Sequence, residues 1–290
     1  MKGRLLLTGA NGRTGRAVLR SLVQAKVPVR AFIREEAQAS ALEALGAHET
    51  VVGDLTDESA LARAVDGVEQ VLHIGPPMHA DEFTITSSLV ARAKAAGVDH
   101  FIYYSVMHPL ARAIRHHRLK LDAEEHLIDS GLAYTILQPS RYMQHLVPIW
   151  RQVVEEGVHA MPFDTNRKFS VVDLQDLADA AAVVACDGRF RFGTYELAGP
   201  QALSQQDMAE IISGVISRPV TARAIPLSEM VDKARAAGAN EDRIAQMGIM
   251  NAHYDAHGFQ SNAEVLQLII GRPATTFRSY VRRLAAKHDT

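Results

Sequence analysis

The sequence predicts a doubly wound α/β protein, with a parallel sheet and a smaller, mainly helical C-terminal lobe. The first half of the 290-residue chain alternates short apolar runs with amphipathic stretches of helical length. Strands separated by helices of this length form βαβ units with parallel pairing and right-handed crossovers. The apolar runs are nearly continuous, which is typical of strands that are covered on both faces.

Six apolar runs are expected to form the strands of this sheet. They lie at residues 4–8, 27–33, 48–52, 70–74, 100–106 and 133–137. The stretches between them are expected to form helices at residues 14–26, 37–45, 58–65, 82–96 and 116–129. In open sheets of this kind, ligands bind at the carboxyl ends of the strands.

The regular alternation stops after the sixth strand. Residues 170–185 are expected to form a short strand and an alanine-rich helix, and residues 193–198 a further strand. From Gln201 onward the pattern is mainly helical. Ser204, with Asp207 three residues later, is the expected N-cap of the first helix there.

These patterns divide the chain into a sheet domain and a lobe. We expect the sheet domain to cover residues 1–140, with residues 169–199 returning to it. The smaller lobe would comprise residues 141–168 and 200–290 and would bind a substrate or a protein partner. A chain of 290 residues is long enough to bury a core of this size.

The composition is that of an ordinary globular protein. Apolar residues make up 47% of the chain and charged residues 22%, and the formal net charge is −2. This charge gives no global attraction to nucleic acid or to an anionic membrane, so neither is an expected partner. Cys186 is the only cysteine, which excludes a disulfide framework. Since no apolar run reaches about 18 residues and no signal-type segment is present, we expect a cytoplasmic location.

A glycine-rich motif, GANGRTG, lies between the first expected strand and helix. Gly9 would permit a tight turn, Gly12 would let the backbone approach a pyrophosphate, and Gly15 would let the helix pack closely. A helix N-terminus at this place favours an anion. The expected dinucleotide-binding loop comprises Gly9, Asn11, Gly12, Arg13, Thr14 and Gly15. The alternative is a glycine-rich turn without a ligand.

The end of the second strand indicates which dinucleotide is bound. An NAD site usually carries a carboxylate there, but Arg34 comes first in this chain. Arg34 and Arg13 together suit a 2′-phosphate, so NADP(H) is favoured over NAD(H). Glu35 is the competing ligand for an NAD ribose. The third interpretation is that Arg34 and Glu35 are solvated charges of a loop and bind no cofactor.

Two further strand ends are expected to contact the cofactor. Asp54 and Leu55 follow the third strand, where the carboxylate could contact the adenine, although turn formation explains Gly-Asp equally well. Gly75 and Pro76 follow the fourth strand, where a small residue lets the backbone run along the cofactor.

Several segments together resemble the NmrA-like family of atypical short-chain dehydrogenases/reductases. They are GANGRTG, GDLTD, HHRLKLDAEEHL, YTILQPSRYMQ, SVVDLQDLADAAAVVA, TYELAGPQALSQQDMAEII and IIGRPATTFRSYV. The resemblance covers nearly the whole chain. It implies a Rossmann-type NAD(P)-binding domain, a smaller C-terminal lobe and NADP(H) as ligand. The family includes NADPH-dependent reductases of quinones and triphenylmethane dyes, and redox-sensing regulators that bind a dinucleotide without turnover.

The resemblance also points to catalytic residues. Typical members of the superfamily use a serine on the fifth strand and a Tyr-x-x-x-Lys pair on the next helix. Ser105 and Lys120 match the serine and the lysine, which would bind the nicotinamide ribose. His116 stands in the tyrosine position, and its ordinary pKa near 6.5 suits proton transfer around neutrality. A solvated helix start is the alternative reading of His116.

The segment after the sixth strand is the expected substrate site. Tyr142, Met143 and His145 lie at the carboxyl edge of the sheet and could line an apolar pocket, although core packing explains them equally well. No metal is expected: His253 and His257 have a helical ligand spacing but lack the accompanying glutamate.

We therefore expect an NAD(P)H-dependent oxidoreductase that passes hydride to a small apolar electrophile, such as a quinone or another carbonyl compound. The departure at His116 keeps a second hypothesis open. In it, the protein is a non-catalytic NADP(H)-sensing regulator of NmrA type that binds a protein partner.

Overall fold

The computed structural model describes residues 3–288. The contacts within the chain divide it into two compact units. The first unit comprises the chain up to Ala111, His116–Pro139 and Leu174–Glu196. The second comprises Arg112–Arg115, Ser140–Asp173 and the chain from Leu197 onward. The segment that returns to the first unit is therefore shorter at both ends than the expected 169–199.

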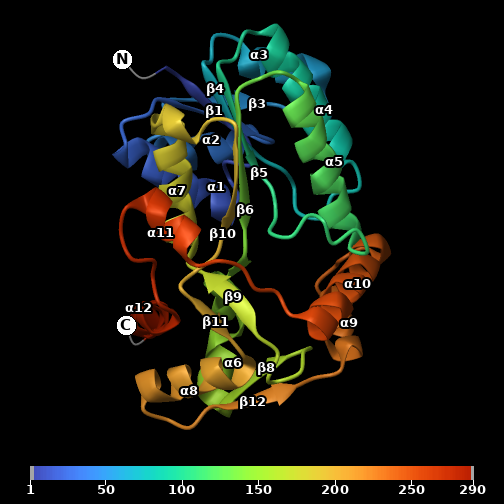
Figure 1. The fold of residues 1–290 in the computed structure, drawn as a ribbon, viewed down its shortest axis with the longest axis vertical. Helices are drawn as coiled ribbons and strands as arrows, with labels where there is room; N and C mark the ends of the chain where they lie inside the picture. The colour runs from blue at the N-terminus through green and yellow to red at the C-terminus, as the bar shows by residue number, and fades with distance from the viewer. Residues whose placement is uncertain (1–2, 289–290) are drawn as a thin grey trace. The chain divides into compact units, whose positions relative to one another are not determined.

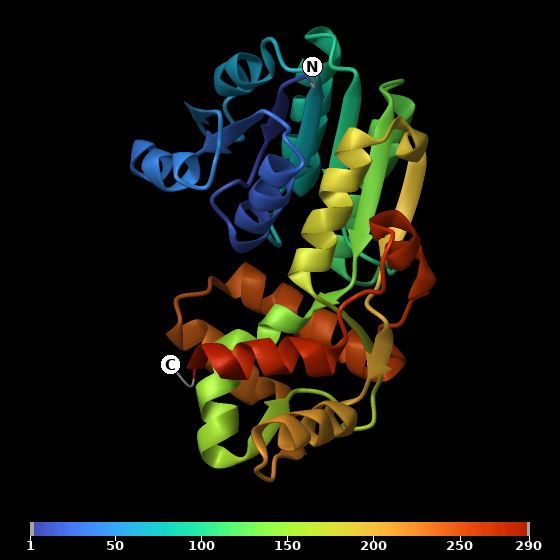
Figure 2. The ribbon, with the colours of Figure 1, turned by 90° about the vertical axis from the view of Figure 1, so that its left-hand side faces the viewer.

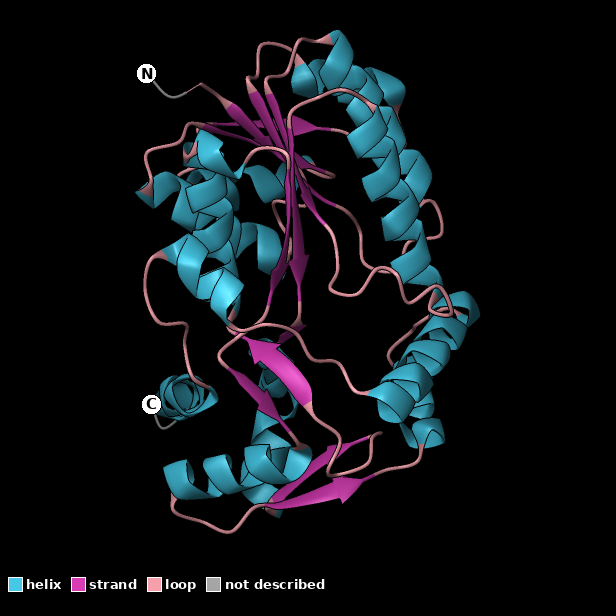
Figure 3. Ribbon diagram, in the orientation of Figure 1, coloured by secondary structure: helices cyan, strands magenta, loops and turns pink. Residues whose placement is uncertain are grey.

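The first unit is built on one seven-stranded sheet (Figures 1 and 3). The strands are β1 (Leu5–Leu7), β2 (Val29–Ile33), β3 (Glu49–Val52), β4 (Gln70–Ile74), β5 (His100–Tyr104), β6 (Tyr134–Pro139) and β10 (Gly193–Leu197). Their order is β10-β6-β5-β4-β1-β2-β3, and the pairs from β6 across to β3 are parallel. The order reverses between β1 and β4, which is the place where such sheets bind ligands.

Helices cover both faces of this sheet, so the predicted doubly wound Rossmann-type architecture is confirmed (Figure 1). The helices are α1 (Arg13–Gln24), α2 (Ala39–Glu43), α3 (Glu58–Val65), α4 (Glu82–Ala95), α5 (Arg115–Asp129) and α7 (Leu174–Cys186). Figure 2 shows α1 and α7 side by side on one face, where the Ser21 hydroxyl donates to Asp179 at 2.9 Å. α3, α4 and α5 lie on the other face (Figure 1). The expected helix 37–45 is instead a 3₁₀ turn, η1 (Glu36–Gln38), followed by the short α2.

The second unit combines small sheets with helices. Its strands are β7 (Arg141–Tyr142), β8 (Val158–Met161), β9 (Phe169–Val172), β11 (Gln201–Leu203) and β12 (Thr221–Ala224). Three of them form a sheet in the order β11-β9-β7, and β12 pairs with β8 in parallel. The helices are α6 (Trp150–Glu156), α8 (Gln205–Ile216), α9 (Leu227–Ala236), α10 (Glu241–His257), α11 (Glu264–Ile270) and α12 (Phe277–His288), with the 3₁₀ turn η2 at Met143–Ile149. A further 3₁₀ turn, η3 (Gly188–Phe190), follows α7 in the first unit.

The predicted N-cap of the first C-terminal helix is confirmed. The Ser204 hydroxyl accepts from the Asp207 backbone, and the Asp207 carboxylate accepts in turn from the Ser204 backbone at 2.8 Å. The mainly helical expectation from Gln201 onward missed β11 and β12, which are only three and four residues long. No helix among residues 3–288 is long and apolar enough to cross a membrane.

Candidate cofactor and catalytic site

The glycine motif joins β1 to α1 and makes a tight loop. Gly9 has φ +62°, and a Cβ there would lie 2.6 Å from the Ile74 carbonyl oxygen. A Cβ on Gly15 would lie 2.1 Å from the Gly9 carbonyl oxygen. Both positions therefore require glycine because of packing within the protein, whatever the loop binds.

Gly12 differs from the other two glycines because packing alone leaves room for a side chain. Its φ is −69°, and a Cβ there would meet only the Gly9 carbonyl oxygen, at 3.3 Å. It is the N-cap of α1, and within residues 3–288 no side chain caps this helix start. An uncovered helix N-terminus behind a glycine fits the pyrophosphate of a dinucleotide.

Arg16 holds the shape of this loop. Its guanidinium donates to the Asn11 side-chain oxygen at 2.5 Å and to the Asn11 carbonyl at 3.1 Å. Thr14 is half-buried in the first turn of α1, whereas Arg13 is exposed beside it. The loop is thus ordered by the protein itself, with a cationic side chain on its outer surface.

Arg34 and Asp54 follow the carboxyl ends of the neighbouring strands β2 and β3. The Arg34 side chain is 70% exposed, and its Nε lies 3.8 Å from the Asp54 carboxylate. Asp54 accepts from the Thr56 hydroxyl at 2.6 Å and from the Thr56 backbone at 2.8 Å, and these bonds lower the pKa of its carboxyl. The turn-forming role of Asp54 is therefore visible in the structure. Leu55 packs against the core behind it.

A buried ion pair joins the helices that follow β4 and β5. Lys120 Nζ on α5 donates to Glu82 Oε1 on α4 at 2.7 Å, and the Tyr103 hydroxyl donates to the same oxygen at 2.8 Å. Lys120 also lies 3.4 Å from the Tyr104 carbonyl. A Cβ on Gly75 would lie 2.7 Å from Glu82 Oε1, so this glycine makes room for the carboxylate. Pro76 is half-buried next to it.

The ionisation of this cluster follows from its contacts. Burial opposes the charge of Glu82, but the Lys120 ammonium and the two hydrogen bonds lower the pKa of the carboxyl. Burial and the neighbouring Glu82 carboxylate raise the pKa of Tyr103 well above its usual value. Tyr103 is thus a neutral hydrogen-bond donor. Glu82 was not predicted as a site residue, because acidic residues are common in the first turn of a helix.

A second polar cluster surrounds Ser105 at the end of β5. The Ser105 hydroxyl donates to Glu124 Oε1, and Gln138 Nε2 donates to the two Glu124 oxygens at 3.0 and 2.8 Å. Burial raises the pKa of Glu124 although these hydrogen bonds oppose the shift. Ser105 and Lys120 thus lie at the same sheet edge as the glycine loop, each bound to a carboxylate.

His116 is half-buried in the first turn of α5, so its side chain is only partly solvated. Its Nδ1 has no hydrogen-bond partner within the described part of the chain, and its ring meets that of His117 at 4.5 Å between centroids. Burial, aided by His117 and Lys120, lowers the pKa of His116 to about 3. The expected pKa near neutrality is therefore corrected: His116 is an uncharged imidazole at neutral pH.

This pKa shift predicts a pH-dependent stability. The pKa of His116 is about 3 in the folded protein and near the usual 6.5 in the unfolded chain. Between pH 3 and 6.5, His116 is therefore protonated in the unfolded chain and neutral in the folded protein. His116 therefore stabilises the fold above pH 6.5, and that contribution is lost as the pH falls. We expect the contribution of His116 to the free energy of unfolding to be about 2 kcal/mol smaller at pH 5 than above pH 6.5. Urea unfolding of wild type and His116→Gln between pH 7.5 and 5 measures the difference.

His48→Gln is the matched control, because His48 is exposed in the same unit. Wild type and His48→Gln should lose stability in parallel on acidification, and His116→Gln should lose less. Equal losses in all three proteins would contradict the lowered pKa of His116.

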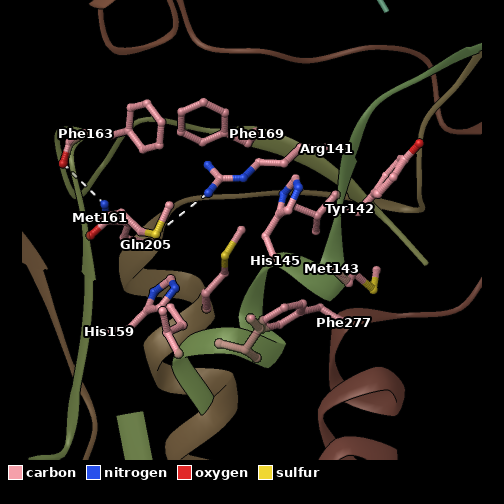
Figure 4. A pocket seen from close by; sticks show the side chains of 14 residues that line it. Arg141, Tyr142, Met143, His145, His159, Met161, Phe163, Phe169, Gln205 and Phe277 are labelled. Carbon is pink, nitrogen blue, oxygen red and sulfur yellow. Dashed lines mark hydrogen bonds between the residues drawn. The ribbon is translucent and has the colours of Figure 1, made fainter. Parts of the chain in front are cut away.

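The expected substrate residues line a pocket within the second unit (Figure 4). Tyr142 and His145 stack with ring centroids 5.7 Å apart, and Met143 is buried beside them. Trp150 is buried but is not among the lining residues. The sequence analysis missed Arg141, His159 and Gln205, the polar residues of the lining. His253 and His257 lie on α10, and no group of three or more metal-binding side chains occurs among residues 3–288.

Comparisons with known proteins find similarity over nearly the whole chain. The NmrA-like family profile matches residues 1–269. The chain is 29% identical over 283 residues to an NAD(P)H azoreductase from Xenophilus azovorans. The aligned residues make up 97% of this chain and 98% of that protein. The chain is 28% identical over 288 residues to quinone oxidoreductase 2 from Escherichia coli, with 97% and 98% covered.

Two solved structures share the fold over the whole length. The Escherichia coli NADPH-dependent quinone oxidoreductase complexed with NADPH has a TM-score of 0.86 at 27% identity, and 97% of this chain and 99% of that chain are covered. The Citrobacter sp. triphenylmethane reductase complexed with NADP(H) has a TM-score of 0.85 at 25% identity, with the same coverage.

Proposed function

The chain belongs to the NmrA-like family, and we propose that it is an NADPH-dependent reductase of a small apolar electrophile such as a quinone or another carbonyl compound. The observation that carries the proposal is the uncovered helix N-terminus at Gly12, which suits a dinucleotide. Whole-length relatives named as an NAD(P)H azoreductase and a quinone oxidoreductase support the reaction class.

The cofactor would lie along the carboxyl ends of β1 to β4. The glycine loop would hold its pyrophosphate, and Asp54, Leu55, Gly75 and Pro76 would border the rest. Arg13 and Arg34 would hold the 2′-phosphate through bidentate hydrogen bonds. The long, exposed contact between Arg34 and Asp54 costs little to give up. When bound, the cofactor supplies the hydride.

Lys120 would hold the nicotinamide ribose. An ammonium has three donors, and only the bond to Glu82 is short. The contacts to Tyr103 and to the Tyr104 carbonyl are both 3.4 Å. Glu82 therefore fixes the position of Lys120 Nζ while leaving donor capacity for a ribose hydroxyl.

The reduced acceptor needs one proton in addition to the hydride, and Ser105 with Glu124 would deliver it. Ser105 would donate its hydroxyl proton to the acceptor oxygen and would recover a proton from solvent through the Glu124 carboxyl, to which it is hydrogen-bonded. His116 contributes no proton from a charged form at neutral pH, because its pKa is about 3.

Steady-state oxidation of NADPH by a panel of quinones, carbonyl compounds and azo dyes tests the reductase proposal. We expect turnover with at least one quinone, and a loss of roughly 100-fold in kcat for Ser105→Ala. Failure of every acceptor to oxidise NADPH, with the protein folded and the cofactor bound, would overturn the proposal.

Arg34→Ala is expected to remove the preference for the phosphorylated cofactor. The loss of a bidentate contact should weaken NADPH binding roughly tenfold or more and leave NADH binding nearly unchanged. Calorimetric titration of both cofactors measures this preference. Arg63→Ala is the control, since Arg63 lies on α3 and contacts Ser59. A preference that survives in Arg34→Ala would contradict the assigned role.

A second function is favoured by one observation. The tyrosine of typical superfamily members is replaced by His116, which is half-buried and neutral at neutral pH. A dinucleotide sensor that binds a protein partner needs no proton donor at this place. In that case NADP(H) would bind without turnover. A pull-down with the immobilised chain should then retain different proteins in the presence and in the absence of NADP(H).

A further inference from the structure

The pocket of the second unit contains a guanidinium beside two adjacent aromatic rings. Arg141 lies on β7, and its guanidinium carbon is 5.2 Å from the Phe163 ring centroid and 5.4 Å from that of Phe169. Its guanidinium donates a hydrogen bond to the Met161 sulfur at 3.8 Å, and Figure 4 shows the side chain lying beside Phe163 and Phe169 and reaching toward Met161. Burial lowers the pKa of Arg141 to about 10, so it stays charged at neutral pH.

This charge has no matching anion among residues 3–288. Throughout residues 3–288 no carboxylate and no carbonyl oxygen accepts a hydrogen bond from Arg141. A guanidinium has five N–H donors, and a thioether sulfur is only a weak acceptor. The aromatic faces attract the cation but offer no oxygen to its donors. Arg141 is half-buried, and a cation that is partly removed from water without an anion is costly to the fold, so the arrangement is incomplete as it stands.

Two more polar atoms in the lining lack partners in the described chain. They are His159 Nδ1 and Gln205 Oε1, on side chains that are 4% and 3% exposed. Burial, together with the Arg141 charge, lowers the pKa of His159 to about 4, which leaves the imidazole neutral. A neutral imidazole can donate from Nδ1, so His159 offers a hydrogen bond to a ligand without adding charge.

The rest of the pocket is apolar. Its other walls include Met143, Leu146, Ile149, Val171, Met208 and Phe277. An apolar cavity with a few convergent polar groups is the usual form of a small-molecule site. The walls suit an aromatic or aliphatic body, and Arg141 suits a planar anionic head that can accept two parallel hydrogen bonds.

We infer that this pocket binds an apolar, aromatic molecule through an anionic substituent, a carboxylate or sulfonate, that pairs with Arg141. The assignment of this molecule as the electron acceptor rests on the proposed function. The binding itself does not, because every residue of the site lies in the second unit. The preferred acceptors would then be quinones that carry an acidic group.

Calorimetric titration of the full-length protein with naphthalenesulfonate, naphthol and inorganic sulfate tests the binding without any turnover. We expect naphthalenesulfonate to bind at least about tenfold more tightly than either naphthol or sulfate. Arg141→Met should remove this preference, whereas Arg151→Met should keep it. Arg151 is a matched control because it lies in the same unit, 87% exposed and paired with Glu155.

Stability measurements keep the test independent of misfolding. Arg141→Met removes an uncompensated charge, so its ligand-free unfolding midpoint should equal or exceed that of wild type. If that variant does not fold, Arg141→Lys keeps the charge without the planar fork and should lose the preference for naphthalenesulfonate over naphthol. Equal binding of naphthalenesulfonate and naphthol to wild type, or an unchanged preference in both variants, would overturn the inference.

Turnover then separates this inference from the proposed function. With NADPH, naphthoquinone sulfonate should have a higher kcat/KM than naphthoquinone in wild type but not in Arg141→Met. Reduction of neutral quinones without any binding of naphthalenesulfonate would overturn only the inference. Binding of naphthalenesulfonate through Arg141 without any NADPH oxidation would overturn only the reductase assignment.

Discussion

Lys120→Met is expected to lower the free energy of unfolding by about 3–5 kcal/mol, because it leaves the buried Glu82 carboxylate without its cation. Lys120 Nζ and Glu82 Oε1 are 2.7 Å apart, and the two side chains are 11% and 4% exposed. The Tyr103 hydroxyl remains as a donor to Glu82, but a neutral donor does not compensate the charge. Urea denaturation at neutral pH measures the loss.

The double variant Lys120→Met with Glu82→Gln is the matched control. Glutamine keeps an acceptor for the Tyr103 hydroxyl and removes the charge, so the double variant should recover about half of the loss or more. If the double variant loses the sum of the two single losses, the ion pair carries no coupling energy. That result would contradict the burial-based account of the cluster.

The two glycines Gly15 and Gly12 are expected to respond in opposite ways to substitution. Gly15→Ala places a Cβ 2.1 Å from the Gly9 carbonyl oxygen, which should cost about 3 kcal/mol of stability and distort the loop. Gly12→Ser meets no such obstacle and supplies a favourable N-cap, so its stability should equal or slightly exceed that of wild type. It should nevertheless weaken NADPH binding at least about tenfold.

Thermal unfolding and calorimetric titration of the same preparations measure both effects. A Gly12→Ser variant that is stable and binds NADPH as tightly as wild type would contradict the location of the pyrophosphate. A Gly15→Ala variant of unchanged stability would contradict the close approach of α1 to β1.

The sheet was predictable from the sequence because its strands are buried on both faces. The near-continuous apolar runs locate β4 at Gln70–Ile74, as expected, and the helical pattern locates α3 at Glu58–Val65. The second unit was less predictable, because strands such as β7 are only two residues long and depend on their pairing partners. Short strands of this kind leave no periodic signal.

The candidate site was predictable in its residue types and less so in its ionisation. The motif located Lys120, but only the fold brings Glu82, 38 residues away in sequence, to its ammonium. The burial that lowers the pKa of His116 depends on packing that a helical pattern does not reveal. Arg141 looked like an ordinary polar residue, since its burial depends on the pairing of β7 with β9.

Calorimetric titration of the wild-type protein with NADPH and NADH tests the central claim most directly. The structure predicts saturable binding of NADPH that is tighter than the binding of NADH and is weakened in Gly12→Ser. An absence of binding by either dinucleotide, in protein that is shown to be folded, would contradict the claim and with it both proposed functions.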